Sequence, residues 1–256
     1  MKFTLEFVEY ALLIIVRITA IIMIAPIFNS RNIPTKLKGI ISLFLSLIVL
    51  NTVDYNAVSY EGILGYSILV VKEAITGTLI GFGSGICLYI LNFSGHMIDM
   101  EIGFSMAMEF DPTTNVQSTV TAQLLNTALL LVFLVSDMHY FVIDALYDSY
   151  QLIPVGKMEF SASLYQIVAT YMTDYFVIGV RIVLPIFACI LVINIVLGIL
   201  AKVAPQMNMF VIGMQLKVLV GLCLLFFIMT LLPGMSDMIF EEMQKMTKLL
   251  IHAITP

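Results

Sequence analysis

One stretch of this sequence, Gly95–Gln117, gathers carboxylates and methionines between two strongly apolar segments. A carboxylate at membrane depth is costly and faces protein or water rather than lipid. Methionine is flexible and fills irregular gaps, which suits a surface that must re-pack. We therefore interpret the stretch as a constriction or gate inside a membrane assembly. Its acidic residues and methionines are Asp99, Glu101, Glu109, Asp111, Met97, Met100, Met106 and Met108.

No catalytic or metal-binding pattern stands out elsewhere. His96 and Asp99 are three residues apart and could share a helix face, but a metal site or proton relay needs further ligands, and none is obvious. The motifs HExxH, GxSxG and the P-loop are missing. Asp144 and Asp148 repel each other on a helix unless they face water or a cation. We predict neither an enzyme nor a cofactor or metal site.

The composition indicates which class of protein holds these residues. Of 256 residues, 61% are hydrophobic and only 11% are charged, against about 25% charged in a soluble domain. This is typical of an all-α, polytopic membrane protein. The net charge of −5 is spread along the chain and gives no basic face for nucleic acid. Three cysteines in apolar runs, Cys87, Cys189 and Cys223, are interpreted as buried small hydrophobic residues.

Apolar runs predict the membrane-type helices. Lys157–Thr173 is read as amphipathic and peripheral, and no cleavable signal peptide is expected. Gly39–Val53 is marginal as a span, which needs about 20 residues. Ionisable residues within the apolar runs, such as Lys72, Arg181 and Lys217, favour helices that face protein more than lipid. The predicted segments are Ala11–Phe28, Gly39–Val53, Ile63–Phe93 as one helix, Gln123–Val135, Tyr175–Leu200 with Pro185 inside it, and Val211–Leu232.

Two features predict contacts between these helices. Arg17 lies inside the first apolar run, where it either snorkels to an interface or has a partner within the protein. Gly77, Gly81 and Gly85 repeat every four residues and form a ridge where another backbone can come close, either for packing alone or for function.

The central stretch predicts both a packed face and a plug. Gly95, Asp99 and Gly103 fall on one helix face, suited to close packing with one hydrogen-bonding partner. If the helix continues, it pairs Phe104 with Met108 and Met106 with Phe110 at i,i+4, until Asp111-Pro112 stops it. These four residues form either an ordinary core stripe or a loop that plugs a pore, and the flanking acids and the helix break favour the plug.

Four blocks of residues, taken in order, resemble the FliR/YscT/SpaR family of type III export-gate proteins, and its flagellar branch in particular. Met106, Met108 and Glu109 depart from the small or apolar residues common there. The blocks are Arg17, Pro26, Phe28, Pro34 and Lys38; Gly95, Asp99, Gly103, Asp111 and Pro112; His139, Ser149, Pro154 and Gly156; and Pro185, Gly198, Pro205, Gln206, Asn208, Phe210, Lys217 and Gly221.

The resemblance implies a single export-gate subunit with a FliP-like half (1–173) joined to a FliQ-like half (174–256), built of long kinked helical hairpins. It implies a gate formed with FliP and FliQ, with FlhB at its cytoplasmic mouth, inside the flagellar basal body at the bacterial inner membrane. Unfolded flagellar proteins would pass through it. The loop 104–116 would plug the pore through Phe104, Met106, Met108 and Phe110. No appended FlhB-like domain is expected. Packing and assembly would rest on Arg17, Gly95, Asp99, Gly103, Asp111, Pro112, Pro205, Gln206, Asn208 and Lys217.

Other functions stay open at this point. A virulence injectisome gate differs little in sequence from a flagellar one. A proton-coupled small-solute transporter would use Asp99, Arg17 and Arg181, although no internal repeat is evident. A membrane enzyme is disfavoured because no catalytic motif is present.

Overall fold

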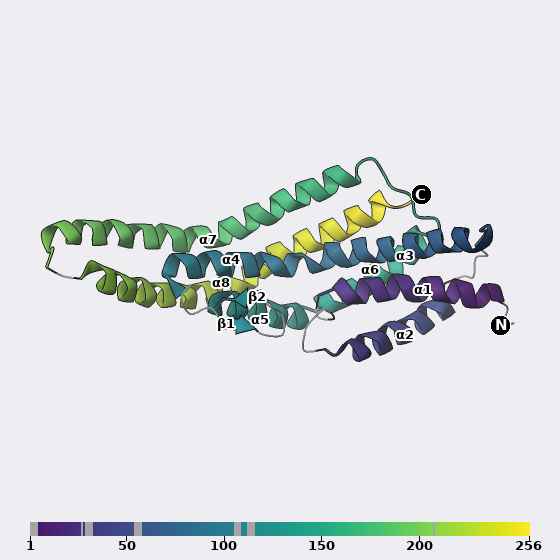
Figure 1. Cartoon of the computed structure of the whole chain (residues 1–256), viewed down its shortest axis with the longest axis horizontal. Helices are drawn as coiled ribbons and strands as arrows, with labels where there is room; N and C mark the ends of the chain where they lie inside the picture. The colour runs from purple at the N-terminus through teal and green to yellow at the C-terminus, as the bar shows by residue number, and fades with distance from the viewer. Residues whose placement is uncertain are drawn as a thin grey trace. The chain divides into compact units, whose positions relative to one another are not determined.

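The computed structural model describes residues 5–26, 28, 33–53, 58–104, 109–111, 116–206 and 208–256. In this part of the chain the fold is all-α, with one short antiparallel ladder that pairs Glu109 with Ser118 and Asp111 with Val116. Its elements are α1 (Leu5–Ile24), α2 (Thr35–Thr52), α3 (Gly62–Gly85), α4 (Cys87–Ile102), β1 (Glu109–Asp111), β2 (Val116–Ser118), α5 (Val120–Val135), α6 (Met138–Leu152), α7 (Leu164–Val203) and α8 (Met209–Ala253) (Figure 1).

Several of these helices could cross a membrane. Among the described residues, α1, α2, α3, α7 and α8 are long and apolar enough to do so. Pro185 in α7 and Pro233 in α8 lie inside the helices without ending them. The predicted all-α, polytopic membrane protein is therefore confirmed.

The chain divides into two compact units. Unit 1 comprises 1–87, 136–171 and 240–256, and so holds α1, α2, α3, α6, the start of α7 and the end of α8. Its core includes one stripe of α1, at Tyr10, Leu13, Ile14, Arg17, Ile18, Ile21 and Ile22. That spacing of three and four residues keeps the stripe on one helix face.

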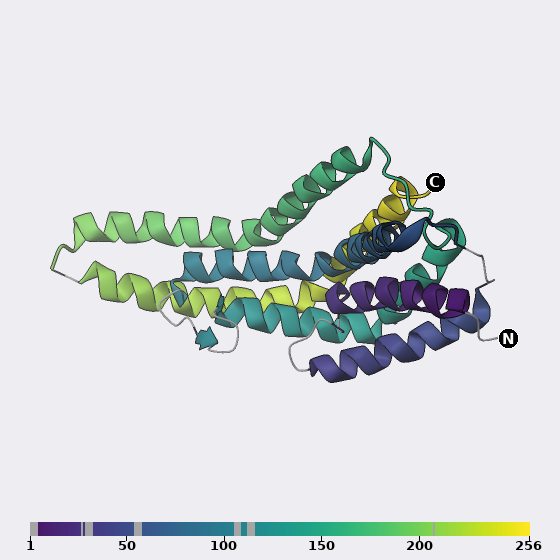
Figure 2. The same cartoon turned by 45° about the vertical axis from the view of Figure 1, so that its right-hand side comes forward.

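The glycine ridge of α3 packs directly against α1, which lies alongside it in both views (Figures 1 and 2). A Cβ atom added to Gly77 would lie 2.3 Å from the Arg17 carbonyl oxygen, and one added to Gly85 would lie 2.6 Å from the Ile24 carbonyl oxygen. At Gly81 the nearest atoms, on Ile24 and Ile21, would be 3.0 and 3.1 Å away. The predicted close backbone approach is confirmed, and its partner is α1.

Gly77→Ala should destabilise the isolated chain by about 1–3 kcal/mol, the usual cost of overpacking. The neighbouring atom is a backbone oxygen, so one of the two helices must move. Gly39→Ala in α2 is the matched control, because a Cβ there meets nothing within 4 Å; a helical Gly→Ala change in open space stabilises by about 0.5–1 kcal/mol. Thermal unfolding in detergent measures both, and equal midpoints for the two variants would contradict the close approach.

Unit 2 comprises 88–135 and 172–239, and so holds most of α4, the ladder, α5 and most of α7 and α8. Here too, glycines bring helices together. A Cβ on Gly95 of α4 would lie 2.3 Å from Ala122 Cα in α5, and one on Gly221 of α8 would lie 2.6 Å from the side chain of Ile102. The Ser94 hydroxyl donates to the Gly179 carbonyl at 3.0 Å, which joins α4 to α7.

The predicted single helix Ile63–Phe93 is wrong in one place. The helix is interrupted at Ile86, between α3 and α4. Three glycines, Gly81, Gly83 and Gly85, weaken the end of α3, and the Ser84 hydroxyl bonds to the carbonyls of Ile80 and Gly81 at 3.2 and 3.0 Å. Such back-bonding favours bends and breaks in helices.

Two further helix boundaries differ from the prediction. Lys157–Thr173 is not a separate peripheral segment, because α7 begins at Leu164 and continues without a break into the predicted span. Its first turns are anchored in unit 1, where Tyr171 packs with Met246 and Leu250 of α8.

The predicted continuation of the helix from Gly95 to Asp111-Pro112 is also wrong. α4 ends at Ile102 rather than at Asp111-Pro112. Gly103 has φ +96° and its N–H donates to the Asp99 carbonyl at 3.0 Å. A positive φ just past the last turn is the usual glycine helix stop, so α4 does not extend to Phe104 or Phe110. Met106 and Met108, their predicted partners, lie outside the described residues.

Candidate functional site

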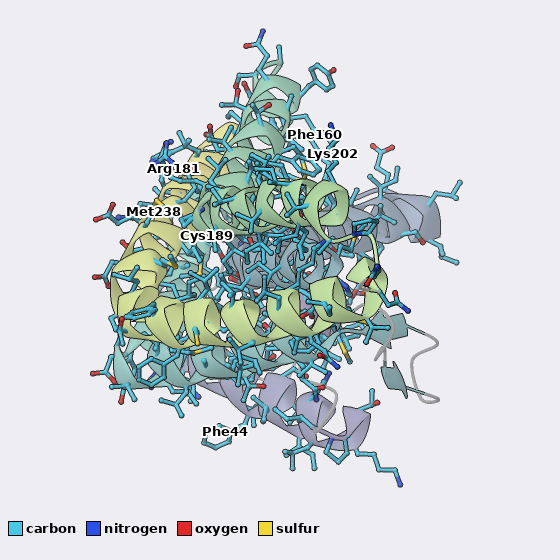
Figure 3. The ribbon with its side chains drawn as sticks, turned by 90° about the vertical axis from the view of Figure 1, so that its left-hand side faces the viewer. Phe44, Phe160, Arg181, Cys189, Lys202 and Met238 are labelled. Carbon is cyan, nitrogen blue, oxygen red and sulfur yellow. The ribbon has the colours of Figure 1, made fainter. Side chains whose placement is uncertain are left out.

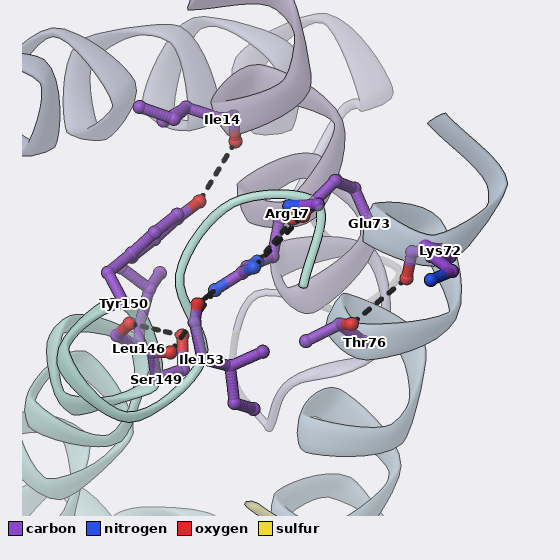
Figure 4. Close-up of polar contacts among 10 residues, drawn as sticks. Ile14, Arg17, Lys72, Glu73, Thr76, Leu146, Ser149, Tyr150 and Ile153 are labelled. Atoms are coloured by element: carbon purple, nitrogen blue, oxygen red, sulfur yellow. Dashed lines mark hydrogen bonds and ion pairs between the residues drawn. The ribbon is translucent and has the colours of Figure 1, made fainter. Parts of the chain in front are cut away.

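Arg17 of α1 is fully buried in unit 1 and forms a bidentate ion pair with Glu73 of α3. Its Nε donates to Glu73 Oε2 at 2.5 Å, and its Nη2 donates to Glu73 Oε1 at 3.0 Å (Figure 4). Both side chains have 0% exposure. The forked geometry matches the two parallel N–H groups of a guanidinium to the two oxygens of a carboxylate. The pair therefore fixes α1 against α3 in one register.

The same guanidinium also holds the end of α6. Arg17 Nη1 donates to the carbonyls of Ser149 and Ile153 at 3.2 and 3.0 Å. The Ser149 carbonyl also accepts the Ile153 N–H at 2.9 Å, and Ile153 lies just past the last helical residue. The C-terminal end of a helix carries the negative end of its dipole, so a buried cation is favourable here.

Tyr150 and Gly156 complete this junction. The Tyr150 ring lies under the guanidinium, 4.3 Å from Arg17 Cζ, and its hydroxyl donates to the Ile14 carbonyl at 3.1 Å (Figure 4). Glu73 Oε1 also accepts the Gly156 N–H at 2.7 Å. Gly156 has φ +81°, a conformation that favours glycine. α1, α3, α6 and the loop after α6 thus meet at one ion pair, which we call the Arg17 junction.

The sequence identified Arg17 as a candidate for an internal partner, but it did not identify Glu73 as that partner. Of its two alternatives, snorkelling and an internal partner, the structure has the internal partner. One signal was available: Glu73 is the acidic residue within the third apolar run, and opposite charges inside apolar helices tend to pair. Ser149 and Gly156 were noted in the sequence, but not as partners of Arg17.

Asp99 forms a second buried polar contact, within unit 2. Its side chain is 0% exposed. Asp99 Oδ2 accepts the Thr121 N–H at 2.9 Å, and Oδ1 accepts the Thr121 hydroxyl. Thr121 lies in the first turn of α5, where backbone N–H groups lack helical partners and a negative charge is favourable. Asp99 of α4 therefore caps α5 from outside that helix.

The glycines on either side of Asp99 differ in role. Gly95 contacts Ala122 beside the cap, whereas a Cβ added at Gly103 would meet nothing within 4 Å. The predicted three-residue packing face is thus shorter than expected, because Gly103 ends the helix instead of packing.

The predicted plug falls mostly outside the described residues. Met106, Met108 and Pro112 lie there. Phe104 follows the end of α4 and is half-buried, and Phe110 and Asp111 belong to β1. The plug and its residues stay a prediction.

Comparison with known proteins covers almost the whole chain. Residues 8–243 match the family model of bacterial export proteins, family 1. The flagellar biosynthetic protein FliR of Bacillus subtilis (strain 168) is 31% identical over 224 residues, 86% of each chain. FliR of Pectobacterium carotovorum subsp. carotovorum is 30% identical over 89% of this chain and 87% of its own, and FliR of Escherichia coli (strain K12) is 26% identical over 89% and 87%.

The chain belongs to the FliR family of bacterial export proteins. It is therefore a membrane protein of the flagellar apparatus with a role in flagellar export. The matched range includes the Arg17 junction, Asp99 with Thr121, and the loop 104–116.

In this FliR-family chain the other residues predicted to serve packing and assembly lie on the α7–α8 hairpin. Pro205, Gln206 and Asn208 form the connection between the two helices and are exposed, and Lys217 of α8 is half-buried. Their role in assembly stays a prediction.

The predicted histidine, aspartate and cysteine positions can be compared with the structure. Among the described residues, no group of three or more His, Cys, Asp or Glu side chains could hold a metal ion. His96 and Asp99 therefore gain no further ligands there. Cys189 and Cys223 are exposed, so the expectation that they are buried is wrong for both; their helix faces lie on the surface of the chain.

Proposed function

We propose that this chain is a subunit of the flagellar type III protein export gate. With FliP and FliQ it would form the pore through which unfolded flagellar proteins cross the bacterial inner membrane, with FlhB as a further partner. The observation that carries the proposal is 30–31% identity over 86–89% of the chain to proteins named flagellar biosynthetic protein FliR. The chain would serve as a structural component of the apparatus rather than as an enzyme.

The exposed apolar surface of the described helices supports a role in an assembly. Large hydrophobic side chains are exposed along α7 and α8, among them Phe176, Leu184, Val192 and Phe226. We propose that 174–256 forms the FliQ-like hairpin and 1–173 the FliP-like part. A hairpin with such faces needs protein or lipid around it.

Gene deletion tests the function. Loss of this chain should abolish flagellar filaments and the secretion of filament protein, and re-expression should restore both. Isolation of the chain from membranes should bring FliP and FliQ with it in a stable complex. Intact filaments with lost secretion of virulence proteins would instead assign it to an injectisome, and solute uptake by the chain alone in liposomes would assign it to a transporter.

We further propose that Phe104, Met106, Met108 and Phe110 plug the closed pore. Apolar side chains exclude water and ions from a constriction by dewetting, and methionines can re-pack around varied polypeptides. Glu109 and Asp111 would lie at its wet rim.

Replacement of 104–110 by Gly and Ser should leave the yield of the complex unchanged and raise the leak of small ions across the membrane. Ion flux and complex yield measured together check this. If the four residues are core instead, yield should fall, because Phe→Ala in a core costs about 3–5 kcal/mol. Replacement of Asn51 and Thr52 by Gly and Ser serves as the control, since both are exposed at the end of α2 and lie away from the predicted plug in sequence. Normal yield without leak would overturn the plug.

A further inference from the structure

A pocket of about 410 Å³ opens in unit 1, between the start of α1 and the segment that leads into α3. Its volume lies within the roughly 300–1,000 Å³ of ligand pockets. Two glutamates and three tyrosines line it, and none of the described lining residues is basic. We call it the α1–α3 pocket. Its lining residues are Glu6, Glu9, Tyr10 and Leu13, spaced along one face of α1, and Val58, Ser59, Tyr60 and Tyr66.

Glu9 is held in place by the two tyrosines opposite it. The Tyr60 hydroxyl donates to Glu9 Oε2, and this hydrogen bond raises the pKa of Tyr60 to about 12, so the hydroxyl stays a donor at physiological pH. The Tyr66 hydroxyl donates to the Glu9 carbonyl at 3.1 Å. Among the described residues the Glu9 carboxylate has no other hydrogen-bond donor, so its Oε1 can accept one from a ligand.

The tyrosines also give the pocket two aromatic walls. The centroids of the Tyr60 and Tyr66 rings lie 5.4 Å apart, and the rings are tilted by 55°. The faces of such rings attract cations, as do the carboxylates of Glu6 and Glu9. A guanidinium uses both, since it stacks on an aromatic ring and donates to a carboxylate from its edge. The lining therefore favours an arginine side chain as the ligand.

The Arg17 junction shows the same combination with its arginine in place. There the guanidinium lies over the Tyr150 ring at 4.3 Å and is paired with Glu73 (Figure 4). The α1–α3 pocket has the tyrosine rings and the carboxylates, but the described part of its lining supplies no cation. The cation that completes it has to come from outside this lining.

The surroundings of the pocket favour a protein as the source of that cation. Leu5, Val8 and Leu12 form an exposed apolar stripe on α1 beside the lining residues. Ile63 and Leu64, at the start of α3, are 88% and 81% exposed. Exposed apolar surface next to a pocket is typical of protein contacts, and arginine and tyrosine are enriched among the residues that dominate binding there. A small organic amine needs no such apolar surroundings.

A second pocket, in unit 2, has the opposite character. It measures about 440 Å³ and is lined by residues of α7, namely Phe176, Val177, Val180, Arg181 and Leu184. Figure 3 shows Arg181 near Met238, whose sulfur lies 3.9 Å from Arg181 Nη1. This pocket is apolar with one cation, so it does not suit another. The acidic and aromatic lining thus belongs to the α1–α3 pocket and is not a general property of the surface.

We propose that the α1–α3 pocket binds an arginine side chain of a partner protein, with the guanidinium against the tyrosine rings and bonded to Glu9. The source of the arginine rests on the proposed function, because the other gate subunits would supply it. The chemistry of the pocket does not rest on that function, since it follows from the residues of unit 1.

The chemistry is tested on the purified chain in detergent. The sequence has no tryptophan, so Tyr60→Trp places one indole in the wall and keeps an aromatic face. N-acetylargininamide should change its emission in a saturable way, whereas N-acetylcitrullinamide, similar in shape but uncharged, should not. Equal responses to the two amides, or a response to neither, would overturn the proposal. If Tyr60→Trp purifies poorly, Ser59→Trp on the same wall replaces it.

A second substitution in the Tyr60→Trp chain tests the role of the carboxylate. Glu9→Gln should weaken binding of N-acetylargininamide by about 2- to 5-fold, the effect of losing a partly exposed ion pair. Glu159→Gln is the matched control, because it neutralises an exposed acid elsewhere in unit 1, and it should leave binding unchanged. Equal binding by the two variants would contradict recognition by Glu9.

The source of the arginine is tested in the complex isolated from membranes. There the partner's side chain should fill the pocket, so the Tyr60→Trp complex should not respond to N-acetylargininamide. A photo-cross-linking residue in place of Ser59 identifies the partner peptide that reaches the pocket, and the arginines of that peptide are changed one at a time to Glu. Glu9→Arg should lower the yield of the complex, and one of these Arg→Glu changes should restore it.

Three results in this second test would overturn the proposal. A complex that responds as the chain alone does would have an empty pocket, suited to a small organic cation instead. Failure of every Arg→Glu change to restore the yield would remove the ion pair. Lys2 lies outside the described residues, and a response of the chain only after Lys2→Gln would assign the pocket to this lysine. None of these measurements uses filament formation, so failure of the proposed export function is recognised separately by gene deletion.

Discussion

Replacing Arg17 by methionine should unfold the purified chain about 6–20 °C below the unsubstituted protein. Removing one partner of a buried ion pair costs about 3–5 kcal/mol, because the other charge is left without compensation; each kcal/mol lowers the midpoint by about 2–4 °C in a chain of this size. Arg17 also satisfies the Ser149 and Ile153 carbonyls, so three helices lose contacts at once. Thermal unfolding in detergent measures the effect.

Three further variants show whether the loss comes from the buried charge. Arg181→Met removes an exposed arginine from another apolar helix and should leave the midpoint nearly unchanged. Arg17→Lys keeps the charge but loses the bidentate fork, so an intermediate midpoint is expected. Arg17→Met combined with Glu73→Met should recover part of the loss, since no unpaired charge remains. Equal midpoints for Arg17→Met and Arg181→Met would contradict the Arg17 junction.

Asp99→Ala should lower assembly of the complex and destabilise the chain by about 2–4 kcal/mol. A buried donor left without an acceptor costs about 1–3 kcal/mol, and the lost negative charge at the start of α5 adds up to about 2 kcal/mol. Both Thr121 donors lose their acceptor in this variant. The amount of assembled complex and its unfolding midpoint are the measurements.

Two controls separate this structural role from a proton relay. Asp99→Asn keeps an acceptor and the shape of the side chain, so it should recover most of the assembly. Glu101→Ala changes a half-buried acid in the same turn of α4 and should have little effect. A relay predicts the opposite pattern, with normal assembly and lost transport in both Asp99 variants, and that outcome would refute the capping role.

Sequence patterns were most reliable where a feature depends on one helix alone. The spacing of Gly77, Gly81 and Gly85 indicated a close backbone approach, and the structure supplies α1 as the partner. The excess of apolar residues identified an all-α membrane protein, because long apolar helices satisfy their own backbone hydrogen bonds.

The errors arose where local signals compete. Asp111-Pro112 is a strong helix stop, but Gly103 adopts a positive φ eight residues earlier and ends α4 first. Ser84 and three nearby glycines break the segment Ile63–Phe93, which apolar content alone reads as continuous. The exposure of Cys189 and Cys223 could not be read from their apolar neighbours, because apolar surface here faces outward as well as inward.

Composition and motifs were enough to identify the class of this protein, the family it resembles and the polar residues that an apolar chain must satisfy. Which polar groups meet depends on how the helices pack. Glu73 is 56 positions from Arg17, and Ser149 is 132; Thr121 is 22 positions from Asp99. Helix periodicity says nothing about such separations, because it describes one helix face at a time. The packing of α1 on α3 and of α4 on α5 brings these groups within hydrogen-bonding distance, and burial then makes each contact costly to lose.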